Sequence, residues 1–293
     1  MLNRRELLRA GAAAAAAQAL RKTEGSVLLD NPKGNYRFLR GGVAYSSGAV
    51  AGKGYEVVHA VFSSPPPYRR GFEVMDRHLQ QQGRPPQALC GMELRSPKPF
   101  TFDGFGEFNL GYVEQLKKRA ILVEGVNPVA RTNVAPGVDP PAEVSLYGFS
   151  YTAPASGSGP SFVVAGAGEL RVEGAYPDNI VRRGDVSADG MRAKAEHVLG
   201  LMEGRLRDLG AGWAQVTATA VYTVQNIFPL MQELLLSRMA RRGVRASVGI
   251  FPVRRSLSWS LRWMFAAARA SSCYHRKNRS ICRKSLATSG FQA

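Results

Sequence analysis

Two long amphipathic segments, each closed by a glycine and followed by an apolar run, constrain this fold more than any other feature. In residues 68–82 apolar side chains recur every three or four positions, and the segment stops at Gly83 before two prolines. The second segment spans residues 189–209, stops at Gly210 and has an apolar face formed by Met191, Ala195, Val198, Leu201, Met202 and Leu206. The runs that follow, residues 88–95 and 215–224, have strand composition, which predicts an α+β protein.

The remaining patterns extend this plan to both halves of the chain. In the first half we expect strands at residues 49–50, 56–62 and 144–151, and a second helix from about residue 103. In the second half we expect a strand at residues 161–166 and a helix at residues 227–239. Residues 152–160 are rich in Gly, Ser and Pro, as linkers are. The pattern therefore predicts two tandem units, each a sheet covered on one face by two helices.

The two ends of the chain differ from this body. Residues 1–24 place the pair Arg4-Arg5 before an alanine-rich stretch, which is similar to a twin-arginine export signal or fits a non-native extension. We expect a first domain at residues 25–151 with the site, a linker at 152–160, a second domain at 161–242 and an atypical basic tail at 243–293.

Most of the formal charge of +17 lies in that tail, which has ten basic residues and no acidic residue from Arg245 onward. One interpretation is a basic arm that binds nucleic acid or a membrane surface. The other is a shifted reading frame, because a one-base shift across residues 259–267 permits the alternating strand sequence Glu-Phe-Glu-Met-Asp-Val-Arg-Gly. We favour the frameshift, and we expect neither nucleic acid nor a membrane as a partner.

No pattern predicts a metal or an organic cofactor. Cys90, Cys273 and Cys282 lack the spacing of a metal site or a disulfide framework. The chain also lacks a Gly-rich phosphate loop, and no stretch approaches the roughly 20 apolar residues that a membrane-spanning helix needs. We therefore expect a cofactor-independent protein without a metal, located in the cytoplasm, or in the periplasm if residues 1–24 act as an export signal.

One arginine stands out in residues 127–136, Asn-Pro-Val-Ala-Arg-Thr-Asn-Val-Ala-Pro. Arg131 lies in an extended run between a helical pattern and a strand pattern, where its guanidinium would offer a rigid, always-charged fork to a carboxylate. Taken alone, the segment also fits a surface arginine on an edge strand.

Several short motifs, in the same order and at similar spacing, resemble the reactive intermediate deaminase (Rid, YjgF-like) family. Val43-Ala-Tyr-Ser-Ser-Gly48 is similar to the Ala-Pro-Tyr-Ser opening of that family, and Ala130-Arg-Thr-Asn-Val134 is similar to its Ala-Arg-Ser-x-Val signature. The second half contributes the helix at residues 193–210 and the strand at 216–222. The resemblance covers most of residues 35–242 and is closest to bacterial deaminases of 2-aminomuconate and its 5-chloro analogue.

This resemblance implies chorismate-mutase-like (Rid-type) units in tandem, a homo-oligomer formed as a trimer of tandem units, and hydrolytic deamination of a small carboxylate. Arg131 would grip the substrate carboxylate, Tyr45 would line the cleft, and Thr132 and Asn133 would offer hydrogen bonds. The family often has a glutamate on its last strand that holds the attacking water. Here Glu143 is the nearest acid, and Tyr147 is a substitute hydrogen-bonding partner.

Two questions stay open at this level. A muconate has two carboxylates and would need a second cation, for which the sequence offers Arg95, Lys98, Arg182 and Arg183. The alternative to an enzyme is a non-catalytic Rid-like module that binds small carboxylates or stabilises a partner. Release of ammonia from 2-aminomuconate would distinguish the two.

Overall fold

The structure is a computed structural model that describes residues 27–239, except positions 158, 172, 175 and 176. Beyond residue 239 it describes only the backbone of five strands between residues 247 and 284. The predictions for residues 1–24 lie outside the described residues. The interpretation of the tail, residues 243–293, stays a prediction, since the side chains there are not described.

Within the described residues the chain forms two seven-stranded sheets. The first, which we call the β8 sheet, has the order β1 (Leu28–Asn31), β2 (Tyr36–Leu39), β3 (Gly48–Ala51), β8 (Phe162–Gly168), β12 (Leu261–Ala267), β9 (Ala218–Thr223) and β10 (Ser247–Phe251). The second, the β5 sheet, has the order β11 (Val253–Arg254), β6 (Ala130–Pro136), β5 (Leu89–Arg95), β7 (Ser145–Pro154), β4 (Tyr55–Phe62), β13 (Ala270–Tyr274) and β14 (Ile281–Lys284).

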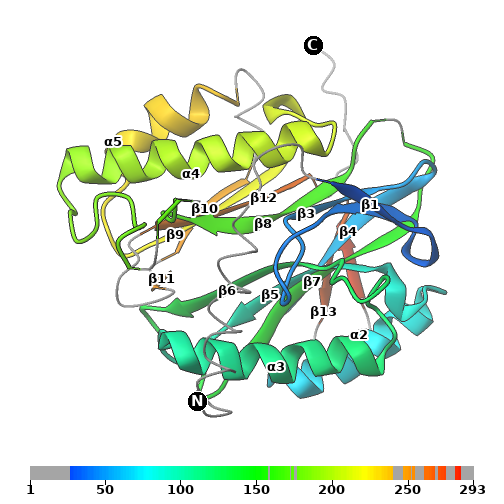
Figure 1. The fold of residues 1–293 in the computed structure, drawn as a ribbon. Coiled ribbons are helices and arrows are strands. Elements are labelled where there is room, and N and C mark those ends of the chain that lie inside the picture. The colour runs from blue at the N-terminus through cyan, green and yellow to red at the C-terminus, as the bar shows by residue number, and fades with distance from the viewer. Residues whose placement is uncertain are drawn as a thin grey trace, which may run out of the picture.

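Helices cover the outer face of each sheet, so that the layers run helix, sheet, sheet, helix (Figure 1). The β5 sheet is covered by α2 (Tyr68–Gln81) and α3 (Phe102–Lys118). The β8 sheet is covered by α4 (Ala188–Asp208), the short α5 (Phe228–Leu230) and the π-helical η4 (Met231–Leu236). Short 3-10 turns, η1 (Pro32–Gly34), η2 (Pro86–Ala88) and η3 (Trp213–Gln215), connect the elements.

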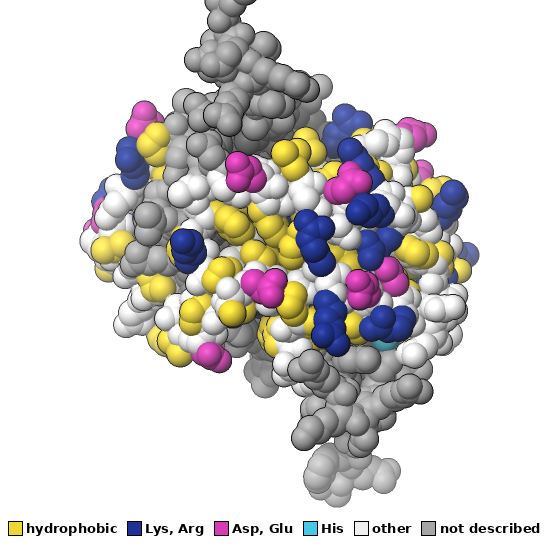
Figure 2. Space-filling view, turned by 90° about the horizontal axis from the view of Figure 1, so that it is seen from below, with side chains coloured by type: hydrophobic (Ala, Val, Ile, Leu, Met, Phe, Trp, Pro, Cys, Tyr) yellow, Lys and Arg dark blue, Asp and Glu magenta, His cyan; other side chains and the backbone are white. Residues whose placement is uncertain are grey.

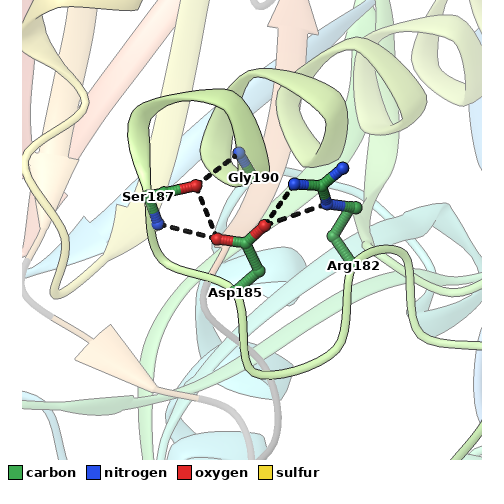
Figure 3. Close-up of polar contacts among 4 residues, drawn as sticks. All are labelled: Arg182, Asp185, Ser187 and Gly190. Atoms are coloured by element: carbon green, nitrogen blue, oxygen red, sulfur yellow. Dashed lines mark hydrogen bonds and ion pairs between the residues drawn. The ribbon is translucent and has the colours of Figure 1, made fainter.

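The helix boundaries follow from local capping chemistry. Ser187 caps α4 by accepting a hydrogen bond from the Gly190 amide, and Asp185 holds the Ser187 hydroxyl and amide in turn (Figure 3). Arg182 donates two hydrogen bonds to the same carboxylate. These contacts hold the pKa of Asp185 far below its usual range, the Ser187 hydroxyl being the largest cause. The loop before α4 is therefore a structural cap.

The facing sides of the two sheets enclose a third core cluster between the two helix-covered cores. Its buried residues are Tyr36, Phe38, Ala49, Val57, Cys90, Ala130, Val134, Val163, Ala165 and Tyr222. Because side chains alternate along a strand, a β6 residue in this cluster and its neighbour along the strand face opposite ways. Ala130 therefore faces the other sheet, whereas Arg131 faces the helices.

The α+β class holds, but the prediction of two tandem units with separate sheets is wrong. Strand β3, from the first half of the chain, pairs antiparallel with β8 through Gly48↔Val164. Strands β1 to β3 thus extend the sheet of the second half, and β13 pairs parallel with β4 of the first half. Pairing between segments so far apart depends on tertiary packing, which local periodicity does not record.

Two further findings concern the second half of the chain and the helices as a whole. The backbone of β12 lies between β8 and β9, antiparallel to both. No helix in the described part of the chain is long and apolar enough to cross a membrane.

Candidate functional site

The structure places the six predicted site residues in three locations. Arg131, Asn133 and Tyr45 lie on the helix-covered side of the β5 sheet or next to it. Thr132 and Tyr147 belong to the side that faces the β8 sheet. Glu143 is exposed in the loop before β7, where its backbone carbonyl accepts a hydrogen bond from Ser145.

We call the first location the helix-side arginine region, formed by Tyr45, Asn109, Tyr112, Arg131 and Asn133. Arg131 is only 2% exposed and donates to Asn109 Oδ1 over 2.7 Å. Its guanidinium carbon lies 4.6 Å from the centre of the Tyr112 ring. Asn133, two residues further along β6, lies on the same side of the strand and accepts a hydrogen bond from Ser96 over 2.7 Å.

An aromatic layer separates this region from solvent. The rings of Phe105 and Phe108 lie 5.5 and 5.9 Å from the Arg131 guanidinium. Phe108 also packs against Tyr68 and Phe100, each with ring centroids 5.3 Å apart. Phe105 and Phe108 are partly exposed, and on the face formed by α2 and α3 apolar side chains gather between charged ones (Figure 2). Arg131 is thus one aromatic layer away from water.

Burial dominates the electrostatics of the region. It lowers the pKa of Arg131, and the phenol groups of Tyr112 and Tyr45 act in the opposite direction. It raises the pKa of Tyr112, against the charge of Arg131. Tyr45 also lies close enough to Arg205 of α4 to interact with its charge. Tyr45 therefore interacts with the charges of both Arg131 and Arg205.

Two polar groups in the region have unused hydrogen-bonding capacity. Among the described residues, the Tyr112 hydroxyl and Asn133 Nδ2 are buried without a hydrogen-bond partner. A buried polar group left unsatisfied costs about 1–3 kcal/mol. A phenol and an amide that can both donate, next to a guanidinium, form an arrangement that an anion would satisfy.

The second location is a group of polar residues on the inter-sheet face. We call it the inter-sheet polar cluster, and it consists of His59, Glu93, Arg95, Tyr147, Ser150 and Tyr222. Glu93 lies 3.4 Å from both His59 Nε2 and Arg95 Nη2. His59 Nδ1 lies 3.2 Å from Ser150 Oγ, and the Arg95 guanidinium lies 4.0 Å from the centre of the Tyr147 ring.

The cluster keeps Arg95 charged despite its burial. Desolvation disfavours the charged form, but Tyr222, Glu93 and Tyr147 together outweigh it, so the pKa of Arg95 is raised. Burial likewise raises the pKa of Tyr222, against the charge of Arg95. The result is a cation, a carboxylate and an imidazole in contact, a set that can bind and exchange protons.

The four predicted candidates for a second cation lie in different surroundings. Arg182 and Arg183 form exposed ion pairs with Asp185 and Asp178. Lys98 is exposed in the segment before α3, and Arg95 belongs to the inter-sheet polar cluster.

Sequence reasoning missed three functional candidates: Glu93, His59 and Arg205. Glu93 and Arg95 are two residues apart in an otherwise apolar strand, which was the available signal for a polar face. No three His, Cys, Asp or Glu side chains in the described ranges form a group that could hold a metal.

A family model described as "2-aminomuconate deaminase CnbZ" matches residues 28–256. The chain belongs to this family. A curated relative, the 2-amino-5-chloromuconate deaminase of Comamonas testosteroni, is 43% identical over 216 residues, covering 73% of this chain and 84% of the relative. The family-level part of the sequence-based prediction, a deaminase of the aminomuconate type, is therefore confirmed.

The predicted tandem Rid-type fold is corrected by the sheet topology. The chain is similar to a solved chorismatase, with a TM-score of 0.45 and 13% identity, over 82% of this chain and 79% of the other. Each sheet of our structure contains strands from both halves of the chain, which contradicts two separate tandem units. The Rid-type fold prediction is withdrawn, while the α+β class stands.

Proposed function

We propose that this member of the CnbZ family hydrolyses 2-aminomuconate or 2-amino-5-chloromuconate to the corresponding 2-hydroxymuconate and ammonia. The observation that carries the assignment of the site is the buried Arg131 next to two donors without partners, Tyr112 and Asn133. A carboxylate would accept from all three groups. Charge-assisted bonds of this kind contribute about 1.5–3 kcal/mol each.

The reaction requires the protein mainly to orient the substrate. The enamine gains a proton on carbon and becomes an imine, and water adds to the C=N carbon to give a carbinolamine. The C–N bond then breaks with release of ammonia and leaves a C=O group, and loss of the proton gained on carbon converts this ketone to the 2-hydroxy enol. Arg131 would fix the carboxylate beside the reacting carbon, which supplies proximity and orientation. The Tyr45 hydroxyl, near both Arg131 and Arg205, is our candidate for proton transfer.

We propose Arg205 as the second cation that a dicarboxylate requires. It is partly buried on α4 and donates to the Ala165 carbonyl over 2.8 Å, which fixes its position. Burial lowers its pKa and the charge interaction with Tyr45 opposes this. Two arginines that both interact with one tyrosine suit a substrate with a carboxylate at each end.

The test is deamination by Arg131→Met and Arg131→Lys, followed as ammonia release. Loss of the guanidinium should cost about 3 kcal/mol of transition-state stabilisation, a fall in kcat/KM of roughly 100-fold. Arg131→Lys should recover only part of this, because lysine keeps the charge but not the planar fork.

Arg119→Lys is the matched control. Arg119 lies 4.6 Å from the Phe72 ring, as Arg131 does from the Tyr112 ring, but it forms an ion pair with Asp76. This variant should lose some stability and keep its kcat/KM. If Arg131→Met retained full activity while folded, the assignment of the substrate site would be wrong.

Assembly and location remain proposals. We propose self-association into a homo-oligomer, which the mass of the purified protein by light scattering would test. We also propose a cytoplasmic location, which fractionation of cells expressing the full chain would test.

A further inference from the structure

The inter-sheet polar cluster lies on the opposite face of the β5 sheet from Arg131. In the parallel pairing of β5 with β6, Arg131 is opposite Met92 and Thr132 is opposite Glu93. Met92 belongs to the helix-side core, so Glu93 and Arg131 face opposite ways. One small molecule cannot touch both.

We propose that the inter-sheet polar cluster is a second binding site for a small carboxylate, with Arg95 as the anchor and His59 and Glu93 as a proton-exchanging pair. This inference goes beyond the proposed deamination and does not depend on it.

Stability alone gives a weak reason for such a cluster. Glu93 and Arg95 have side chains only 9% exposed, next to the apolar residues of the inter-sheet core. Buried ion pairs are often no more stable than apolar residues of similar volume, since both charges lose their water. Ionisable groups gathered at such a position are instead typical of functional sites.

The contacts within the cluster leave Glu93 loosely held. Its distances to His59 and Arg95 are both 3.4 Å, at the long end of the range for hydrogen bonds. A ligand carboxylate can therefore take the place of Glu93 on the guanidinium. Released from Arg95, the Glu93 carboxylate still has His59 Nε2 within 3.4 Å.

Arg95 is held in place before any ligand arrives. Its guanidinium lies over the Tyr147 ring at 4.0 Å and near the Tyr222 ring at 5.4 Å, and Nη1 donates to the Leu94 carbonyl over 3.1 Å. Tyr222 comes from β9, so both sheets contribute to the site. A preorganised planar fork loses little entropy on binding a carboxylate.

The cluster is accessible from the side of His59 and Tyr147. The His59 side chain is 23% exposed, and Tyr147 is partly exposed. Gly148 on β7 is opposite Glu93. Its lack of a side chain leaves room for His59, because a Cβ there would lie 3.4 Å from His59 Cε1 and 2.9 Å from the Ala60 carbonyl oxygen. A ligand from solvent would meet the imidazole first and the guanidinium behind it.

The experiment is calorimetric titration of the full chain with cis,cis-muconate, which lacks the amino group and so is not deaminated. The wild-type chain should bind two molecules, and Arg95→Met and Arg131→Met should each bind one. Arg84→Met is the control, since Arg84 also lies over a ring, that of Tyr55 at 5.0 Å, but is bonded to Thr152 and Asn35. It should bind two.

Failure of this proposal and failure of the proposed function give different results. If Arg95→Met binds as many molecules as wild type, the second site is refuted, whatever Arg131→Met does. If Arg131→Met keeps both activity and stoichiometry while Arg95→Met loses one molecule, the second site stands and the assignment of Arg131 fails.

A second measurement covers the case in which Arg95→Met does not fold. His59→Gln changes a residue at the solvent edge of the cluster. Because a bound carboxylate adds negative charge beside His59 and Glu93, we expect the pair to take up a proton from the buffer, so the wild-type binding enthalpy should depend on the ionisation enthalpy of the buffer. That dependence should be lost in His59→Gln. An unchanged buffer dependence in His59→Gln would overturn the role of the pair.

Discussion

The two faces of the β5 sheet hold arginines in contrasting surroundings. On the helix side Arg131 is next to an amide, a phenol and aromatic rings, and two nearby donors lack acceptors. On the inter-sheet side Arg95 is in contact with a carboxylate, which also contacts an imidazole. A cation among donors can bind an anion directly, whereas Arg95 can bind a carboxylate only by exchanging Glu93 for it, next to an imidazole that can exchange protons. Surroundings, more than the arginine itself, set the chemistry of each face.

The largest expected effect in this comparison comes from giving the helix-side region its own carboxylate. Asn133→Asp would place an acid on the same side of β6 as Arg131. It would compete with the substrate for the guanidinium, and we expect kcat/KM to fall roughly 100-fold, about 3 kcal/mol. Steady-state deamination and thermal unfolding measure the result together.

Asn179→Asp is the control for this change. Asn179 is buried in the second half, where it donates to the Arg171 carbonyl, so the same change of charge occurs far from Arg131. It should leave kcat/KM unaltered even if stability falls. Full activity in folded Asn133→Asp would show that the substrate carboxylate does not bind beside Arg131.

A smaller effect, the pH dependence of stability, tests whether water is excluded from the helix-covered side of the β5 sheet. His78 of α2 is buried against Tyr151, 3.1 Å from its hydroxyl, and burial lowers the pKa of His78 to about 4. The unfolded chain binds this proton near pH 6.5, before the folded chain does. Stability should therefore decrease as pH falls from about 6.5 to 4, by up to about 3 kcal/mol. Below pH 4 this contribution should not change further.

Urea unfolding at a series of pH values measures this slope. His78→Gln keeps a hydrogen-bonding group for Tyr151 but cannot titrate, so its stability should lack this part of the pH dependence. A slope equal to wild type in His78→Gln would mean that the helix side admits water around His78.

Local periodicity was sufficient to place most helices. The segments predicted at residues 68–82 and 189–209 are found as Tyr68–Gln81 and Ala188–Asp208, because apolar spacing and terminal signals lie within each segment. The sheets could not be assigned in this way. The pairing of β3 with β8 joins residues more than 100 positions apart, and nothing within either strand specifies its partner.

The same distinction applies to the candidate site. Arg131 and Tyr45 are singled out by short motifs, and the structure brings them close enough for the Tyr45 phenol to raise the pKa of Arg131 against the effect of burial. Glu93 was read as one residue of a buried strand. Its contact with His59 exists because β4 and β5 both pair with β7, an order that only the folded sheet reveals.

The smallest predicted effect separates binding from stability most cleanly. Tyr112→Phe removes a buried hydroxyl that has no hydrogen-bond partner among the described residues, so the unfolding free energy should stay the same or rise by up to about 1 kcal/mol. If that hydroxyl donates to the substrate, KM should rise about five-fold, a loss of about 1 kcal/mol in binding free energy.

Tyr36→Phe is the matched control, because the Tyr36 hydroxyl donates to the Leu89 carbonyl over 2.6 Å in the inter-sheet core. It should lose about 1 kcal/mol of stability and keep its KM. An unchanged KM in Tyr112→Phe would place the substrate carboxylate out of reach of the phenol, and the anchor would then consist of Arg131 and Asn133.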